Sequence, residues 1–349
     1  MESLSSVRQR LADFRARTSA LIVPTAGLRL DDGGRLVSEG QTFALSPQAR
    51  SEIARRASIP SEFFAKCSGD IQAFLFNRLY PETLERTAVG ESTQLILLGG
   101  PFVWGITDPE LASLHGDEVL EAALAARPES IDEAQLEVVD FHHDGDAHIA
   151  MVSPAVQTEA RVGDIVRAGL DIYHSNIGEF GTQIESYVFR LSCRNGMLIK
   201  VCRHSHATPA RIRRAATENR DLTRRRVEGM ARMAWNELDA KLTAVRLMAE
   251  ERVDNVAAVI QSVGEKLRFG ERLIQQVLNA LASDEIGLSG TLWDIACAFS
   301  RTGTHSDNLS LRTRRYFQEL SGDFVRERIE RCPSCGALRR GTMRYLPRR

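Results

Sequence analysis

The sequence predicts an α+β protein, because three kinds of segment follow one another along the chain. Short helical patterns with a few strands fill residues 1–90, alternating strand patterns fill 91–208, and amphipathic helical patterns fill 209–328. Strands grouped apart from helices are typical of α+β folds. We therefore predict an N-terminal helical region, a central mixed and mostly antiparallel sheet, a helical C-terminal region, and a basic tail over 329–349.

The first region carries clear helix-start signals. Residues 1–20 form an amphipathic helical pattern, and the Asp-Asp-Gly-Gly at 31–34 predicts a hairpin turn between short strands. Ser46 is placed to cap a helix whose first residue is Pro47. Pro60 ends that helix, and two further helices follow it.

The central region is predicted from period-two alternation and from glycine-containing turns between the runs. A short helix over 117–126 interrupts it. The predicted strands cover residues 95–98, 102–106, 136–142, 147–152, 162–175 and 186–201. The predicted C-terminal helices cover residues 209–250, 251–268, 270–284, 290–302 and 309–328.

The charge balance narrows the function classes. The chain has 349 residues, with 45 Lys plus Arg against 46 Asp plus Glu, so a nucleic-acid surface must be a local patch. No run of about 18 apolar residues predicts a transmembrane helix, and the polar N-terminus lacks the apolar core of a secretory signal. Six cysteines without a framework spacing suit a reducing compartment. We expect a cytoplasmic protein with no membrane partner.

Three stretches of the chain together carry a family likeness. They are Ala49-Arg50 with Ile59–Phe64, Tyr173–Asn176 with Phe189–Met197, and the helix Trp293–Arg301. These stretches, spanning residues 40–328, resemble the domain of unknown function 932 family of plasmid- and phage-associated proteins. The resemblance implies a cytoplasmic protein of a mobile genetic element, often encoded near replication or recombination genes. It implies no particular reaction.

The segment 170–206 has the densest mixture of polar, aromatic and basic side chains. Asn195-Gly196 predicts a hairpin turn, and basic side chains around that hairpin are suited to gripping phosphates while Tyr173 or Tyr187 stacks on a base. An ordinary solvated hairpin is the alternative interpretation. The basic residues concerned are Arg190, Arg194, Lys200 and Arg203.

Tyr173-His174-Ser175-Asn176 ends a predicted strand. Its donors and acceptors suit ligand binding, and a histidine suits acid–base chemistry. Ser and Asn at a strand end also commonly satisfy turn backbone. No serine–histidine–acid order or nucleophile elbow accompanies the segment. Binding or structural roles are therefore favoured over catalysis.

An arginine-rich stretch covers 203–226, where only Glu218 and Asp221 are acidic. Arginine forks suit phosphates, and several such contacts make binding strongly salt-dependent. A solvated helix face is the alternative interpretation. The candidate contacts in this stretch are Arg203, Arg211, Arg213, Arg214, Arg220, Arg224 and Arg225.

The tail contains Cys332-Pro-Ser-Cys335-Gly, which has the spacing of a zinc knuckle. Two thiolates supply only half of a tetrahedral site, so the other ligands must come from upstream or from a second chain. Cys202 and His204 form the best-spaced upstream pair. A knuckle without metal or a redox-sensitive pair is the alternative.

Two further groups of residues are predicted to have structural roles and no binding or catalytic role. The histidines and aspartates at 142–148 flank a predicted Asp-Gly-Asp turn, which favours turn chemistry over a metal cluster. Trp104, Trp235 and Trp293 stand in apolar settings and are predicted core residues.

We predict a non-enzymatic nucleic-acid-binding protein of a mobile genetic element that assists single-strand handling or recombination, with single-stranded DNA as its favoured partner. Apolar stripes on the C-terminal helices favour pairing with further copies of the chain. A second hypothesis is a protein-interaction or regulatory module in phage or plasmid conflict with the host. A third is an enzyme centred on His174.

Overall fold

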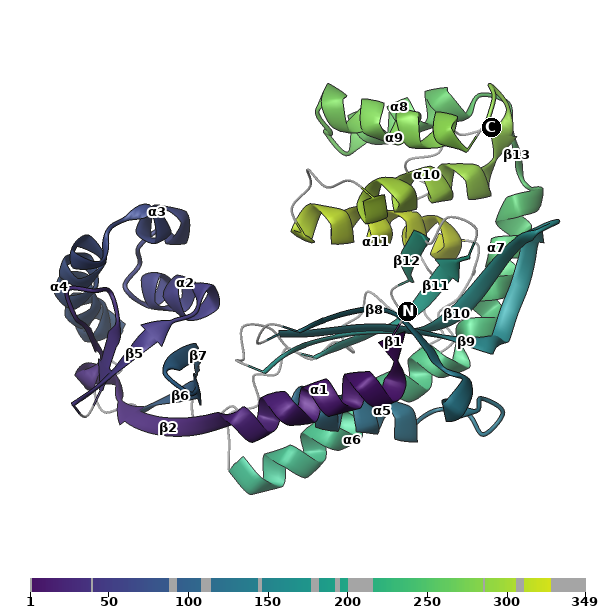
Figure 1. The fold of residues 1–349 in the computed structure, drawn as a ribbon. Helices are drawn as coiled ribbons and strands as arrows, with labels where there is room; N and C mark the ends of the chain where they lie inside the picture. Colours follow the sequence, from purple (N-terminus) through teal and green to yellow (C-terminus); the bar gives the residue numbers. More distant parts are fainter. Residues whose placement is uncertain are drawn as a thin grey trace.

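The computed structural model has the predicted α+β architecture, divided into a smaller and a larger lobe (Figure 1). Each lobe contains its own six-stranded sheet and its own hydrophobic core. The structure describes residues 2–38, 40–87, 93–107, 114–143, 146–176, 182–191, 195–199, 216–284, 286–305 and 311–327.

The smaller lobe is a mixed sheet backed by three helices. Its strand order is β2-β6-β7-β5-β4-β3, and only the β5–β7 pair is parallel. Phe64, Phe76 and Ile53 from the helices pack against Ile96 and Val103 of the sheet. The elements are β2 (Thr18–Pro24), β3 (Arg29–Leu30), β4 (Leu36–Ser38), β5 (Gln41–Leu45), α2 (Pro47–Arg56), α3 (Ser61–Lys66), α4 (Gly69–Thr87), β6 (Thr93–Gly99) and β7 (Phe102–Thr107).

The predicted start of α2 is confirmed. Ser46 is the N-cap, and its Oγ accepts a hydrogen bond from the Ala49 N–H at 3.0 Å. The same hydroxyl donates to the Trp104 carbonyl at 2.9 Å, which ties α2 to β7. Pro47 is the first helical residue, where its missing N–H costs nothing. One serine thus caps a helix and anchors it to the sheet.

The larger lobe contains an antiparallel sheet of order β1-β8-β9-β10-β11-β12. Apart from β1, its strands follow one another along the chain, as expected for hairpin connections. The strands are β1 (Glu2–Ser3), β8 (Glu137–His143), β9 (Asp146–Arg161), β10 (Asp164–Ser175), β11 (Gln183–Arg190) and β12 (Asn195–Ile199).

Helices lie on both sides of this sheet: Figure 1 shows α1, α5 and α6 below it and α10 and α11 above it. Met151 and Leu170 belong to the main core of the lobe, whereas Ala150, Tyr187 and Phe189 form a separate small cluster. The remaining elements are α1 (Leu4–Arg17), α5 (Gly116–Ala125), α6 (Ala216–Asn236), α7 (Leu238–Glu250), β13 (Arg252–Val253), α8 (Val256–Lys266), α9 (Glu271–Ser283), β14 (Gly290–Thr291), α10 (Leu292–His305) and α11 (Leu311–Glu327).

The lobes divide the chain differently from the predicted regions. The strands over 93–107 pair with β2 and β5, so they complete the smaller lobe. Residues 2–17 pack against the larger lobe through β1 and α1. Both differences from the predicted regions arise because strands pair with segments far apart in the sequence. The sequence pattern indicates which residues form strands, but it does not indicate which strands pair with one another.

The hairpin turn predicted at Asn195-Gly196 is wrong. Asn195 pairs with Arg190 and Gly196 pairs with Phe189, so both residues lie within β12. The pairing of β12 with β11 therefore overrides the local Asn-Gly turn preference.

Among the helices that the structure describes, none is long and apolar enough to cross a membrane.

Candidate nucleic-acid interface

His174, one of the predicted site residues, is held inside the larger lobe. Only 4 % of its surface is exposed. Its Nε2 lies 2.8 Å from the Leu114 carbonyl oxygen, and its Nδ1 lies 2.9 Å from the Thr182 hydroxyl. A carbonyl only accepts, so Nε2 carries the proton and Nδ1 accepts from Thr182. Burial lowers the pKa of His174 to about 4, so the imidazole is neutral at neutral pH.

Asn176 and Tyr173 flank this histidine. The Asn176 Oδ1 accepts from the Gly116 N–H at 2.8 Å, which satisfies a backbone donor at the start of α5. Tyr173 is half-buried, and its ring centroid lies 5.9 Å from that of His148. The end of β10 therefore connects the sheet to the start of α5 through the hydrogen bonds of the His174 and Asn176 side chains.

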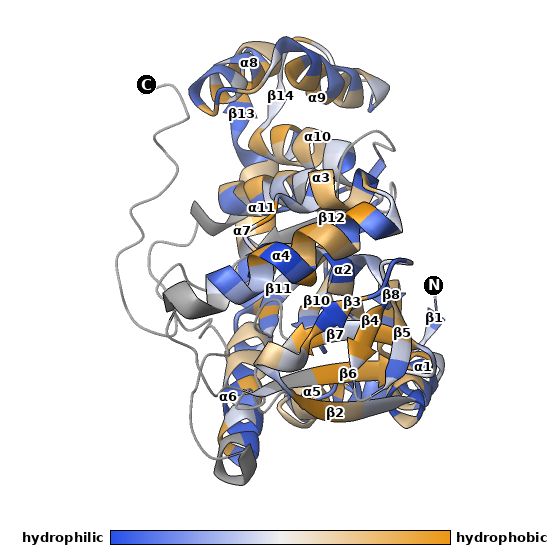
Figure 2. Ribbon diagram, turned by 90° about the vertical axis from the view of Figure 1, so that its left-hand side faces the viewer, coloured by the Kyte–Doolittle hydropathy of each residue, from blue (hydrophilic) through white to orange (hydrophobic). Residues whose placement is uncertain are grey.

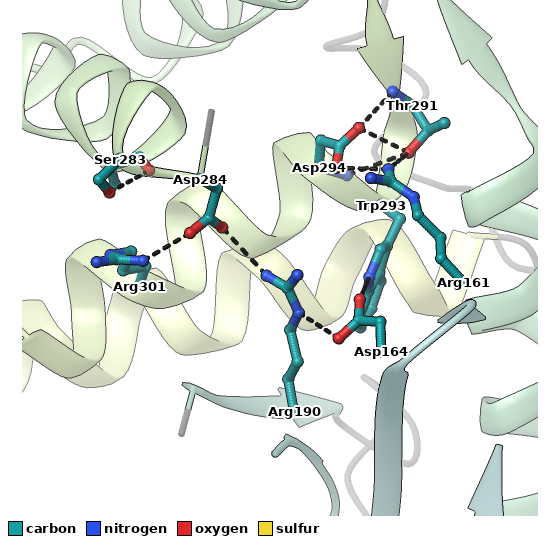
Figure 3. Close-up of polar contacts among 10 residues, drawn as sticks. Arg161, Asp164, Arg190, Ser283, Asp284, Thr291, Trp293, Asp294 and Arg301 are labelled. Carbon is teal, nitrogen blue, oxygen red and sulfur yellow. Dashed lines mark hydrogen bonds and ion pairs between the residues drawn. The ribbon is translucent and has the colours of Figure 1, made fainter. Parts of the chain in front are cut away.

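Arg190 belongs to a polar network between the sheet and the C-terminal helices (Figure 3). Its side chain is 16 % exposed, and its Nε lies 2.6 Å from Asp164 Oδ1. Its Nη1 lies 3.1 Å from Asp284, which also pairs with Arg301 at 2.6 Å. The indole N–H of Trp293 donates to the other Asp164 oxygen at 3.1 Å.

A second polar group lies beside it in Figure 3. Arg161, near the tip of the β9–β10 hairpin, pairs with Asp294 of α10 and donates to the Thr291 hydroxyl at 2.6 Å. Asp294 also accepts from the Thr291 N–H at 2.7 Å. Together with Arg190, these side chains fasten β9, β10 and β11 to α9 and α10. Their charges are directed at one another, with the carboxylate of Asp294 buried and Arg161 partly exposed.

The arginines of α6 are placed differently, because they lie on an exposed part of the helix. Arg220 pairs with Glu118 at 2.5 Å, and Arg224 pairs with Glu228 at 3.2 Å. Arg225 is exposed. Arg226 and Arg232 are exposed too, and no described residue forms an ion pair with these last three arginines. Val227, Ala231 and Ala234 bury the opposite face of α6 in the core.

The basic ends of α1 and α6 meet at the N-terminus of α5. Glu118 accepts from Arg220 and lies 3.6 Å from Arg15, which also pairs with Asp117 at 3.0 Å. Partial burial opposes ionisation of Glu118, but hydrogen bonds from Arg220 and the His115 N–H outweigh it and keep its pKa below the usual range. Figure 2 shows α5 between α1 and α6. Arginines of two helices thus share one end of the larger lobe.

A cavity of about 620 Å³ opens where α1 passes into β2, at the junction of the two lobes. Phe14 is central to its wall: its ring centroid lies 5.7 Å from that of Trp104 and 4.4 Å from that of His143, edge-on in both cases. The wall thus combines aromatic rings with both signs of charge. The described residues that line it are Arg10, Asp13, Phe14, Arg17, Thr18, Gly99, Gly100, Trp104 and His143.

Trp104 is the main residue of this cavity that the sequence analysis missed. It is half-buried, whereas Trp235 and Trp293 are core residues as predicted. A Cβ on Gly99 would lie 2.0 Å from the Trp104 Nε1, so the indole lies directly against a glycine backbone. The Gly99-Gly100 pair shortly before a tryptophan was the available signal, because glycine allows such a close approach.

His148 and Asp171 form a second pair that the sequence analysis did not single out. The His148 Nε2 lies 2.5 Å from Asp171 Oδ1, on neighbouring strands, and the Asp171 carboxylate is 1 % exposed. Asp140 lies 3.6 Å from the other ring nitrogen. No sequence spacing connects residues on three strands, so only the strand register brings them together.

Several predicted site residues lie outside the described part of the chain: Arg194, Lys200, Cys202, Arg203, His204, Arg211, Arg213, Arg214, Cys332 and Cys335. Within the described ranges, no group of three or more His, Cys, Asp or Glu side chains is arranged to hold a metal ion. The zinc site stays a prediction.

In the comparisons with known proteins, no family model, no curated protein and no solved structure matches the chain. The likeness to the domain of unknown function 932 family therefore stays a resemblance of motifs.

Proposed function

We propose that this protein is a non-enzymatic nucleic-acid-binding protein of a mobile genetic element, which binds single-stranded DNA and assists single-strand handling or recombination. The observation that carries the proposal is the exposed arginine surface of α6, made of Arg225, Arg226 and Arg232. We call these three residues the α6 arginines. An arginine whose guanidinium faces water can exchange that water for a phosphate at low cost.

Local charge supports this location. The helix α6 carries five arginines, Arg220, Arg224, Arg225, Arg226 and Arg232, against the acidic Glu218, Asp221 and Glu228. Arg15 and Arg17 of α1 extend the basic end toward the junction of the lobes, where Phe14 and Trp104 line the cavity. Proteins that bind single-stranded nucleic acid commonly combine basic side chains with accessible aromatic rings. The basic side chains contact the phosphates, and the bases stack on the rings.

The test is fluorescence anisotropy of labelled single- and double-stranded oligonucleotides of equal length. The triple variant Arg225→Gln, Arg226→Gln and Arg232→Gln should bind the single strand at least roughly tenfold more weakly than the wild type, because three phosphate contacts are lost. Glutamine keeps the length and helix propensity of the replaced side chains.

The matched control removes the same charge elsewhere. Arg252, Arg268 and Arg272 are exposed arginines around α8 and α9, on the opposite side of the sheet from α6 (Figure 1). Their triple glutamine variant should bind like the wild type. If both triple variants lose the same affinity for the single strand, the binding depends on net charge alone and not on the α6 arginines. No binding of either oligonucleotide at low salt would overturn the proposal, and the arginines would then be expected to meet an acidic protein.

A further inference from the structure

We infer that the cavity at the junction of the lobes is a binding site for one nucleotide, which stacks its base on Trp104 and directs its phosphate to Arg17. This cavity, defined above by its nine lining residues, is called the junction cavity below. The inference deepens the proposed function and rests on it for the source of the nucleotide, a single strand. The chemistry that would be recognised is a planar base joined to a phosphate, free or within a chain.

The size of the cavity fits such a ligand. Small-molecule sites in proteins commonly enclose about 300–1,000 Å³, and the junction cavity measures about 620 Å³. It is also assembled from both lobes: α1 and His143 come from the larger lobe, while Gly99, Gly100 and Trp104 come from the smaller one. Sites between domains are frequent places for ligands, because two rigid bodies supply complementary walls.

The indole of Trp104 supplies the stacking surface. Its described ring contact is with Phe14, at an interplanar angle of 64°, so Phe14 supports the indole at an edge-on angle and does not stack on it. The Gly99 backbone lies against the N–H edge of the indole and fixes that edge. A π-face held in this way suits a nucleobase, and base–aromatic stacking contributes about 1–3 kcal/mol in single-strand binding proteins.

The N–H edge of the indole is covered by the Gly99 backbone, because a Cβ on Gly99 would lie 2.0 Å from Nε1. No described residue accepts a hydrogen bond from the Trp104 Nε1, although the ring is half-buried. By contrast, the indole N–H groups of Trp235 and Trp293 donate to the Ala123 carbonyl and to Asp164. Indole donors in protein interiors usually find a partner. Since Gly99 covers this N–H, we infer that a base contacts Trp104 through the ring face and not through the N–H.

The cavity has one loosely paired arginine that an anion can reach. Arg17 is 78 % exposed and lies 3.8 Å from Asp13, a loose pair at the last turn of α1. Arg10 lies with its guanidinium 4.5 Å from the Phe141 ring centroid and pairs with Glu2 at 2.9 Å. Glu2 holds Arg10, so Arg17, with its looser pair to Asp13, is the arginine able to turn toward a phosphate.

The experiment uses the tryptophan itself as the reporter. Trp235 and Trp293 are almost fully buried, so a ligand that quenches the accessible fluorescence acts on Trp104. The full-length protein is titrated with adenosine monophosphate, adenosine and inorganic phosphate, with excitation at the red edge of the tryptophan band. Adenosine monophosphate should quench saturably, adenosine should bind more weakly, and phosphate alone should not quench. The wild-type quenching should disappear in Trp104→Phe.

Two variants separate the roles of charge and shape. Arg17→Gln should lower the affinity for adenosine monophosphate about tenfold, because a charge-assisted contact to the phosphate is lost. The affinity for adenosine should not change. Gly99→Ala should lower the affinity for both ligands, since the added Cβ displaces the indole of Trp104. Arg78→Gln, an exposed arginine on α4, is the matched control and should bind as the wild type does.

Two negative results have different meanings. If oligonucleotides bind but adenosine monophosphate never quenches saturably, the nucleotide site is overturned while the proposed function stands. If the mononucleotide binds and loses affinity in Arg17→Gln, but no oligonucleotide binds, the cavity takes free nucleotides and the proposed function fails. An equal effect of Arg17→Gln on adenosine and its monophosphate would overturn the assignment of the phosphate to Arg17.

Discussion

His174 is a buried polar side chain whose hydrogen bonds are made within the protein. Its two hydrogen bonds require the neutral ring, and burial holds its pKa at about 4. The unfolded chain binds a proton at His174 near pH 6.5, whereas the folded chain does not until about pH 4. The unfolded state therefore binds more protons in this window, and stability falls as the pH is lowered through it.

The first prediction is the size of that loss. His174 should remove about 3 kcal/mol of unfolding free energy between about pH 6.5 and about pH 4. Urea unfolding at both ends of the window measures it. The variant His174→Gln should show a smaller loss across the window, although its stability at neutral pH is lower. His305→Gln, at an exposed position, is the control. An unchanged pH dependence in His174→Gln would contradict the assignment.

The second prediction concerns Asp164, which accepts from Arg190 and from the Trp293 indole. Asp164→Ala should lower the unfolding free energy by about 3 kcal/mol, because two buried donors lose their acceptor. Asp164→Asn keeps an oxygen for the indole and should cost less. Asp254→Ala, at an exposed site, should be nearly neutral in the same denaturation assay. Equal stability of the Asp164→Ala variant and the wild type would show that the network contributes nothing to stability.

At the scale of single elements, the start of α2 is controlled by one hydroxyl. Ser46→Ala should lower stability by about 1–2 kcal/mol, because the alanine leaves the Ala49 N–H without its cap. Ser51→Ala, at an exposed position within the same helix, is the matched control and should be neutral or slightly stabilising. Thermal unfolding measures both variants. A Ser46→Ala variant as stable as Ser51→Ala would contradict the role of the cap.

Elements with strong local signals could be predicted from the sequence. Ser46-Pro47 marks the start of α2, and the glycine turn over 31–34 joins β3 to β4, with Gly34 at a φ of +70°. The predicted helix over 209–250 is described from Ala216 as two helices, α6 and α7, which break at Glu237. That break lacks a proline or glycine, so composition gives no sign of it.

Candidate site residues were less predictable, because burial and pairing depend on the tertiary structure. Arg190 has the sequence character of a phosphate-binding arginine, yet two aspartates from distant segments enclose it. Trp104 has the character of a core residue, yet it lines the junction cavity. The α6 arginines follow a plain amphipathic pattern, and their exposure agrees with that pattern.

At the scale of the whole molecule, the two lobes have separate hydrophobic cores. Cooperative unfolding depends on contacts within a core, so each lobe should unfold in its own transition. Calorimetry of the full chain should resolve two transitions. Ser46→Ala should lower the midpoint of one of them, and Asp164→Ala should lower the midpoint of the other. If each variant shifts the whole profile together, the lobes unfold as one unit and this prediction is wrong.

The most direct test of the central claim is the salt dependence of single-strand binding. Each phosphate contact to a single strand contributes about −0.7 to the slope of log affinity against log salt concentration. Replacing the three α6 arginines by glutamine should therefore make the slope shallower by about 2, while the Arg252, Arg268 and Arg272 variant keeps the wild-type slope. Identical slopes for the wild type and the α6 variant would contradict a nucleic-acid interface on this helix.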